Sequence, residues 1–159
     1  MIDELDASLI ELLTLQPRIG VLEASRRLRV ARGTVQARLD RMQQRGVIIG
    51  YGPDIDPAAI DHSVTAFVTL ELTQAGGRAQ VAAQLARIDE VLEAHTITGP
   101  GDVLCRVVAR DNADLQRVID AIVEAPGVVR TSTVIALATT VPYRTTPLVR
   151  SAARGAAAS

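Results

Sequence analysis

Apolar residues near the start of the chain recur at the spacing of a helix with one buried face. Asp3 precedes them and can cap the helix, while Gln16-Pro17-Arg18 ends it. The buried stripe consists of Leu5, Leu9, Leu12 and Leu13. The pattern therefore predicts a first helix between Asp3 and Gln16.

Two further helices are predicted before residue 46. One runs from Glu23 to Leu28 and is followed by a three-residue turn, Arg29-Val30-Ala31. The other runs from about Arg32 to Arg45, where Gly46 is a natural C-terminal stop. Its inward-facing residues are Val35, Leu39 and Met42. Three short helices bury little surface by themselves, so we expect them to need a partner or a second domain.

After the third helix the pattern becomes extended. Val47–Gly52 predicts a strand, and Pro53-Asp54-Ile55-Asp56-Pro57 predicts a proline-bounded linker. We therefore expect a helical domain over residues 1–48, a strand and linker over residues 49–63, and a domain boundary between residues 52 and 63.

The second half of the chain alternates between strand and helix patterns. Its segments are a strand over Val64–Leu72 that Gly76-Gly77 ends, a helix around Val81–Ile88, strands over Val91–Thr98 and Val103–Ala109, a helix around Leu115–Ile122, and a strand over Val128–Ala138. The order β-α-β-β-α-β predicts a ferredoxin-like αβ sandwich over residues 64–141. Two helices leave one face of four strands uncovered, which predicts self-association.

The fold class that follows is α+β, with an N-terminal winged helix-turn-helix domain of three helices and a C-terminal ferredoxin-like domain. Residues 142–159 are rich in Ala, Thr, Ser and Arg without periodicity. We expect them to form a mobile tail.

Charge is distributed unevenly along the chain. The 159 residues carry a net charge of −1, yet residues 18–45 hold eight arginines and two acidic residues, a local charge of +6. A short basic block in a mildly acidic protein is typical of a nucleic-acid-binding module. A solvated helix face rich in arginine would show the same charge, and the chain has no lysine at all.

The composition disfavours several classes of protein. No stretch approaches the roughly 18–20 apolar residues that span a bilayer, and the first residues are acidic where a signal peptide is basic. Cys105 cannot form an internal disulfide, and with only His62 and His95 a closed Cys/His zinc site is implausible. We find no catalytic grouping, metal spacing or cofactor motif. We therefore expect a cytoplasmic protein that is not an enzyme and needs no cofactor or metal.

Two helices joined by a tight turn, the second rich in arginine, follow the plan of a DNA-binding helix-turn-helix. In this docking mode the start of the second helix enters the major groove, where Arg and Gln read bases, and later arginines contact phosphates. The expected DNA-binding residues are Arg26, Arg27, Arg32, Thr34, Gln36, Ala37, Arg38, Arg41 and Arg45. A three-helix bundle with exposed arginines that binds no DNA would show the same pattern.

Several segments resemble the Lrp/AsnC (feast/famine) family of transcription regulators, over the chain to about residue 140. They are Leu5-Asp6, Arg38–Met42, Arg45–Tyr51, Thr98–Leu104 and Pro126–Thr133. The resemblance implies a helix-turn-helix followed by an effector-binding (RAM) domain. It also implies homodimers that assemble into octamers or larger rings, with an amino acid or related metabolite bound between RAM domains.

In the family, the turn that matches Thr98–Asp102 holds the amino and carboxylate groups of the effector. The residues that the resemblance assigns to the effector are Thr98, Gly99, Gly101, Asp102, Thr131 and Thr133. Physically, the Asp102 carboxylate can pair with an ammonium beside glycines that let a ligand approach the backbone. The same Gly-Pro-Gly-Asp sequence would also suit a hairpin turn that binds nothing.

The chain departs from the family pattern at Val103, where an aromatic residue usually follows the turn aspartate, and at two positions of the helix-turn-helix. Arg29 stands where the helix-turn-helix turn often has glycine, so we expect an unfavourable backbone conformation there. Ala31 stands where the cap of the third helix is usually serine, so we expect this helix to lack a side-chain cap.

The sequence therefore predicts a transcriptional regulator that binds double-stranded DNA as a homodimer or larger assembly and responds to a small-molecule effector. Two alternatives remain open. One is an architectural DNA-binding protein without an effector, and the other is a ferredoxin-like metabolite-sensing subunit with no DNA role. Thermal-shift screening against amino acids and gel shifts on the chain's own upstream region would separate the three.

Overall fold

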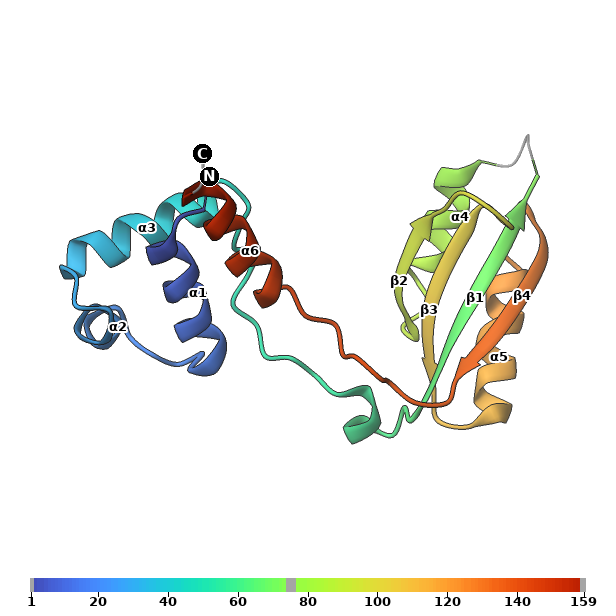
Figure 1. The fold of residues 1–159 in the computed structure, drawn as a ribbon. Helices are drawn as coiled ribbons and strands as arrows, with labels where there is room; N and C mark the ends of the chain where they lie inside the picture. The colour runs from blue at the N-terminus through green and yellow to red at the C-terminus, as the bar shows by residue number, and fades with distance from the viewer. Residues whose placement is uncertain (1, 74–76, 158–159) are drawn as a thin grey trace. The chain divides into compact units, whose positions relative to one another are not determined.

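The computed structural model describes residues 2–73 and 77–157, so Gly76 of the predicted strand break lies outside the described residues. The chain divides into two compact units. One comprises Met1–Pro53 together with Val141–Ser159, and the other comprises Asp54–Thr140. The first is helical and the second combines a sheet with two helices (Figure 1). Within the described ranges, no helix has the length and apolar character needed to cross a membrane.

The helical unit begins with the three predicted helices, α1 (Glu4–Leu15), α2 (Val21–Leu28) and α3 (Arg32–Gln44). They share a core of Leu9, Ala24, Val35, Leu39 and Met42. The predicted cap of α1 is confirmed, because the Asp3 carboxylate accepts the backbone N–H of Asp6 at 2.9 Å. The Asp6 carboxylate in turn accepts the backbone N–H of Asp3, which completes a capping box.

A fourth helix, α6 (Thr146–Ala157), belongs to the same unit and replaces the mobile tail expected from residue 142 onward. It packs against α1, where Ala153 is 1 % exposed and the Arg150 guanidinium donates two hydrogen bonds to the Glu11 carboxylate. Alanine and arginine favour helix strongly. The contact is made by small side chains, so the sequence lacks the large apolar stripe that marks most buried helix faces.

The strand expected over Val47–Gly52 does not form in this chain. The backbone N–H groups of Val47 and Ile48 instead donate to the carbonyl of Met42, at 2.8 and 3.2 Å, and so close the end of α3. A strand requires a neighbouring strand for its hydrogen bonds, and none of the described segments pairs with this one. The linker then leads to a short 3₁₀ helix, η1 (Pro57–Ile60), capped by the side chain of Asp56.

The second unit has the predicted β-α-β-β-α-β order. Its strands are β1 (Val64–Leu72), β2 (Val91–Thr96), β3 (Val103–Ala109) and β4 (Val128–Ala136), and its helices are α4 (Arg78–Leu85) and α5 (Asn112–Val123). All neighbouring strands are antiparallel and lie in the order β2-β3-β1-β4.

The two faces of this sheet differ because side chains alternate along each strand. One face buries Val68, Leu70, Cys105 and Val107 against the apolar sides of both helices. Figure 1 shows α4 and α5 on that same side of the sheet. The opposite face, which includes Phe67 and its cross-strand partner Val134, is covered by neither helix, and Val134 is 62 % exposed.

Candidate functional site

The turn between α2 and α3 has the strained geometry expected from its sequence. Arg29 has φ 55° and ψ 42°, a left-handed conformation that residues other than glycine seldom adopt. The following N–H, of Val30, donates to the Ser25 carbonyl at 3.1 Å and closes the end of α2. Ala31 caps α3 without any side-chain hydrogen bond, as predicted. The two helix-turn-helix departures from the family pattern are therefore both confirmed in the backbone.

The outer face of α3 is polar. Val35, Leu39 and Met42 are buried in the core, whereas Arg32, Gln36 and Ala37 are exposed and Thr34 is half-buried. The Gln36 amide donates to the Asp40 carboxylate at 2.8 Å, one helical turn later. The first two turns of α3 therefore expose Arg32, Gln36 and Ala37, three of the residues that the sequence assigned to DNA.

Arg38 and Arg41 of α3 point toward α1 rather than away from the helical unit. Arg38 donates to the carboxylates of Asp3 and Asp6, the latter at 3.0 Å. Arg41 donates to both oxygens of Asp6, at 2.8 and 3.1 Å. The Asp6 carboxylate is fully buried, and a buried carboxylate needs such partners because desolvation of an unpaired charge is costly.

The contacts of Arg38 shift its own pKa and that of Asp3. Hydrogen bonding from Arg38 lowers the pKa of Asp3, and the bonds to Asp3 and Asp6 raise the pKa of Arg38. At neutral pH the Arg38–Asp3 pair is therefore ionised. The guanidinium of Arg38 is compensated within the protein, where the sequence assigned it to DNA.

The other predicted DNA contacts lie at the surface. Arg26 and Arg27 are exposed on α2 and share the Glu23 carboxylate, at 3.8 and 3.2 Å. Pairs this exposed are weak, so a phosphate can compete for them. Arg45 is exposed at the end of α3. Arg29, which the sequence analysis did not assign to DNA, is exposed in the turn before α3 and is positioned by its left-handed backbone.

The turn between β2 and β3 contains the predicted effector residues. Gly99 and Gly101 have φ of 110° and 120°, where a side chain is strained. A Cβ on Gly101 would lie 2.4 Å from the Cγ2 of Thr69 and 3.2 Å from the carbonyl oxygen of Leu70. Only glycine fits at this position, because the turn lies directly against β1.

The Asp102 carboxylate joins this turn to the end of β1. One oxygen accepts the backbone N–H of Leu72 at 2.8 Å, and the backbone N–H of Asp102 donates to the Leu70 carbonyl at 2.8 Å. The other oxygen lies 3.7 Å from the guanidinium of Arg78, at the start of α4. Sequence reasoning missed Arg78, because this contact joins positions 24 residues apart with no shared motif.

Thr131 and Thr133 lie on β4, on the far side of β1 from the turn. Thr131 is opposite Leu70 and Thr133 is opposite Val68, so both threonines share the helix-covered face of the sheet. Both are half-buried. Within one chain, β1 lies between the β3 end of this turn and the strand that carries the two threonines.

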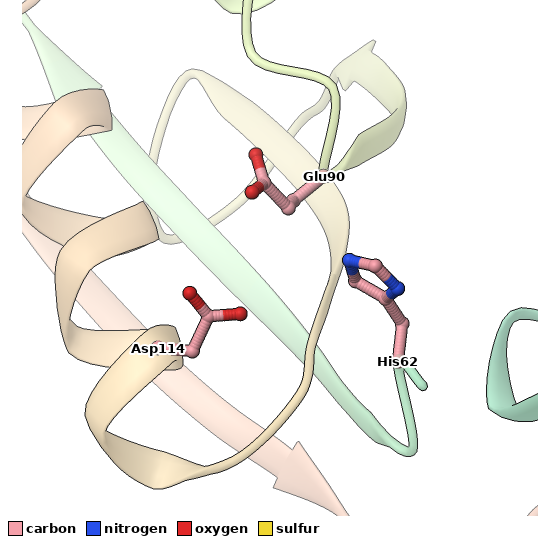
Figure 2. A group of neighbouring side chains, drawn as sticks. All are labelled: His62, Glu90 and Asp114. Atoms are coloured by element: carbon pink, nitrogen blue, oxygen red, sulfur yellow. The ribbon is translucent and has the colours of Figure 1, made fainter. Parts of the chain in front are cut away.

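A cluster of His62, Glu90 and Asp114 resembles a metal site in its composition (Figure 2). Its potential ligand atoms all lie within 4.8 Å of one another. However, both Asp114 oxygens accept hydrogen bonds from the side chains of Arg110 and Arg117, and Glu90 pairs with Arg117. Hydrogen bonds from Arg110 are the main reason that the pKa of Asp114 lies well below its usual range. We interpret the cluster as an ion-pair network that anchors the start of α5.

The remaining candidate residues have structural surroundings. Cys105 is fully buried in β3, and burial raises the pKa of its thiol to about 11. The thiol is therefore neutral at physiological pH and acts as a small apolar residue. His95 is exposed on β2 and lies 3.3 Å from the Glu93 carboxylate.

Both units match known proteins. Residues 2–43 match the AsnC-type helix-turn-helix domain, and residues 65–146 match the Lrp/AsnC ligand binding domain. The HTH-type transcriptional regulator FL11 of Pyrococcus horikoshii is 30 % identical over 87 % of this chain and 91 % of its own length.

Solved structures agree with these matches. The structure of AsnC from E. coli has a TM-score of 0.84 at 29 % identity, over 92 % of this chain and 99 % of that one. A feast or famine regulatory protein from M. tuberculosis, complexed with L-methionine, has a TM-score of 0.80 at 27 % identity, over 90 % of this chain and 97 % of that one.

Proposed function

Because this chain belongs to the Lrp/AsnC family of transcriptional regulators, we propose that α3 binds the major groove of duplex DNA and that an amino acid binds at the β2–β3 turn. The chain is a regulator with a helix-turn-helix domain and a ligand-binding domain. The Pyrococcus horikoshii relative is an HTH-type transcriptional regulator. The finer proposal concerns which side chains carry each activity.

The observation that carries the DNA proposal is that some polar side chains of α3 pair with α1 while others are exposed to solvent. Arg38 and Arg41 hold the helix against α1, while Arg32, Gln36 and Ala37 are exposed on its outer side. Glutamine and arginine at the start of a recognition helix read adenine and guanine by bidentate hydrogen bonds. We therefore assign base contacts to Arg32, Gln36 and Ala37.

Phosphate contacts fall to arginines at the edges of this face. Arg26, Arg27 and Arg45 are exposed, and arginine at such positions fixes the register of a protein on the duplex. Arg29 joins this group because the turn presents it beside the start of α3. Thr34 is half-buried and suits a backbone contact rather than a base contact.

A gel shift tests the DNA proposal. The probe is a duplex from the region upstream of the chain's own coding sequence, and the variants are Arg32→Gln and Gln36→Ala. Loss of one bidentate base contact is worth about 1–3 kcal/mol, so each variant should bind the preferred duplex roughly 5- to 150-fold more weakly. Arg87→Gln is the control, because Arg87 is exposed in the other unit. Unchanged affinity in both α3 variants would refute the assignment.

The effector proposal rests on opposite charges beside a glycine turn. Asp102 offers a carboxylate oxygen and Arg78 a guanidinium, 3.7 Å apart and both accessible to solvent. A zwitterionic amino acid carries the complementary ammonium and carboxylate. The L-methionine bound by the M. tuberculosis relative supports an amino acid as the ligand class. Gly99 leaves the backbone open, because nothing lies within 4 Å of the position of a Cβ there, and Thr98 precedes it. Gly101 lets the turn lie directly against β1.

The site would be completed by a second copy of the chain. The uncovered face of the sheet, with Phe67 and Val134, supports pairing of two C-terminal units into a homodimer, which larger rings would extend. Thr131 and Thr133 belong to the strand beside β1 and remain assigned to the same ligand.

Thermal-shift measurements against the L-amino acids test the effector proposal. A ligand at about 100 times its Kd stabilises the folded state by about 2.7 kcal/mol, which raises Tm. The shift should disappear in Asp102→Asn and Arg78→Gln and persist in Arg87→Gln. If no amino acid raises Tm, the architectural alternative is favoured and the effector assignment fails.

A further inference from the structure

The C-terminal helix places additional positive charge on the DNA-binding unit. Residues 1–53 contain eight arginines and six acidic residues, a net charge of +2, and residues 141–159 add Arg144, Arg150 and Arg154 with no acidic residue. The helical unit therefore carries +5, while residues 54–140, with six arginines and twelve acidic residues, carry −6. More than half of the net positive charge of the helical unit comes from the end of the chain.

The direction of α6 follows from its contacts with α1. Arg150 pairs with Glu11 near the middle of α1, while Thr146 and Pro147 at the start of α6 share a hollow with Leu15 at the end of α1. The two helices are therefore antiparallel. Figure 1 shows the same course, with the end of α6 beside the start of α1.

This direction places Arg154 near the start of α1. It lies one helical turn beyond Arg150, about 6 Å farther along α6. The start of α1 is also where Asp3 and Asp6 hold the middle of α3. Arg154 is exposed, and it forms no ion pair with any residue in the described ranges. Its charge is therefore available to a ligand near the start of α1, the helix to which Arg38 and Arg41 join α3.

We propose that Arg154 of α6 contacts the phosphate backbone of duplex DNA and so extends the helix-turn-helix surface. The proposal rests on the proposed function and names a further contact for the same DNA. Arg150 has a different role, because its guanidinium is occupied by Glu11 and fixes α6 on α1. An exposed arginine beside a recognition helix meets phosphate rather than base edges, since only the backbone reaches the flank of the groove.

Arg144 provides a matched control within the same segment. It is exposed and unpaired among the described residues, but it precedes α6, at the opposite end of that helix. Eight residues of helix, about 12 Å, separate Thr146 from Arg154. Arg144→Gln therefore removes the same charge from the same unit at a position away from the middle of α3.

The experiment measures fluorescence anisotropy of a labelled duplex of about 30 base pairs from the chain's own upstream region. Full-length wild type, Arg154→Gln, Arg154→Lys and Arg144→Gln are titrated between about 50 and 200 mM KCl. Each phosphate contact contributes about 0.9 to the slope of log K against log salt. Arg154→Gln should lower the magnitude of that slope by about 0.9 per bound subunit. The ratio of wild-type to variant affinity should therefore be about three- to fourfold smaller at 200 mM than at 50 mM KCl.

Arg154→Lys should retain the slope of the wild type, and so should Arg144→Gln. Far-UV circular dichroism should show the same helix content in all four proteins, because neither arginine has an internal partner. An unchanged salt slope in Arg154→Gln, or an equal decrease of the slope in Arg154→Gln and Arg144→Gln, would refute the proposed phosphate contact of Arg154. If the wild type binds no duplex at any of these salt concentrations, the proposed function fails, and this contact fails with it.

Discussion

Replacement of Asp6 by alanine should weaken the helical unit. Asp6 is completely buried and accepts hydrogen bonds from Arg38 at 3.0 Å and from Arg41 at 2.8 Å. Its loss leaves Arg41 and the backbone N–H of Asp3 without this partner, and it leaves Arg38 paired with Asp3 alone. Removal of one partner from a fully buried ion pair costs about 3–5 kcal/mol.

The cost at Asp6 should be smaller than that limit, because the arginine side chains reach solvent. Arg38 is 25 % exposed and Arg41 is 43 % exposed, so water can solvate both once the carboxylate is gone. We expect a loss of about 2–3 kcal/mol in the free energy of unfolding of the helical unit. Asp6→Asn should lose less, because the amide oxygen still accepts one hydrogen bond.

Urea unfolding followed by far-UV circular dichroism measures this loss. The midpoint should fall at an unchanged m value, since the native fold is retained. Glu4→Gln is the control, because Glu4 is exposed on the same turn and its charge is worth about 0.3–1 kcal/mol at a helix start. A double-mutant cycle of Asp6→Asn with Arg41→Gln should give a coupling energy of about 1–2 kcal/mol. An Asp6→Ala midpoint equal to that of the wild type would refute the reasoning.

Three further changes test other parts of the fold. Gly101→Ala should destabilise the C-terminal unit by about 2–4 kcal/mol, because it combines backbone strain at φ 120° with a 2.4 Å contact to Thr69. Gly99→Ala should cost about 1–2 kcal/mol from backbone strain alone. Equal losses of stability in urea unfolding would contradict the close approach of Gly101 to β1. Arg110 and Arg117 lower the pKa of Asp114, so its stabilisation is present above the unfolded carboxyl pKa of about 4 and is lost as pH falls below it. Asp114→Asn should therefore flatten the acid side of the stability–pH curve, and an unaltered curve would show that the network contributes nothing. Ala153→Leu should cost about 1–3 kcal/mol by overpacking the α1–α6 contact, and wild-type stability would show that α6 does not dock there in solution.

Local patterns predicted most of the fold because each element buries one periodic face. The stripe of Val35, Leu39 and Met42 fixed α3, and the alternation along β1 fixed the buried face of the sheet. The departures at Arg29 and Ala31 were also local, so their backbone consequences could be read from the sequence. What local patterns cannot show is the partner of a polar side chain.

Arg38 illustrates this limit. It lies three residues after Val35 and four before Met42, at the border of the buried stripe, so periodicity allowed either direction. The side chain turns inward because Asp6, 32 residues earlier, is buried beside it. Asp3 and Asp6, at helical spacing on either side of Leu5, were the available signal, and only Asp3 was interpreted from the sequence, as the cap of α1.

The sequence pattern did not predict the packing of α6 on α1, because this contact also depends on polar and small side chains. Its contact with α1 uses Ala153 and the Arg150–Glu11 pair, which give no large apolar periodicity. The Asp102–Arg78 contact likewise depends on the three-dimensional arrangement of α4 and the β2–β3 turn. Interactions between distant polar residues therefore made up most of what the sequence did not predict.

The central claim is that the arginines of α3 divide into one that faces DNA and two that hold the helix in place. The most direct measurement compares the affinity and the salt dependence of duplex binding in Arg32→Gln and Arg38→Gln, each alongside its free energy of unfolding. Arg32→Gln should bind the preferred duplex roughly 5- to 150-fold more weakly at unchanged stability, because it loses a base contact. Arg38→Gln should lose stability while the folded protein keeps the affinity and the salt slope of the wild type. A lower slope in Arg38→Gln at full stability, with wild-type binding in Arg32→Gln, would contradict the account.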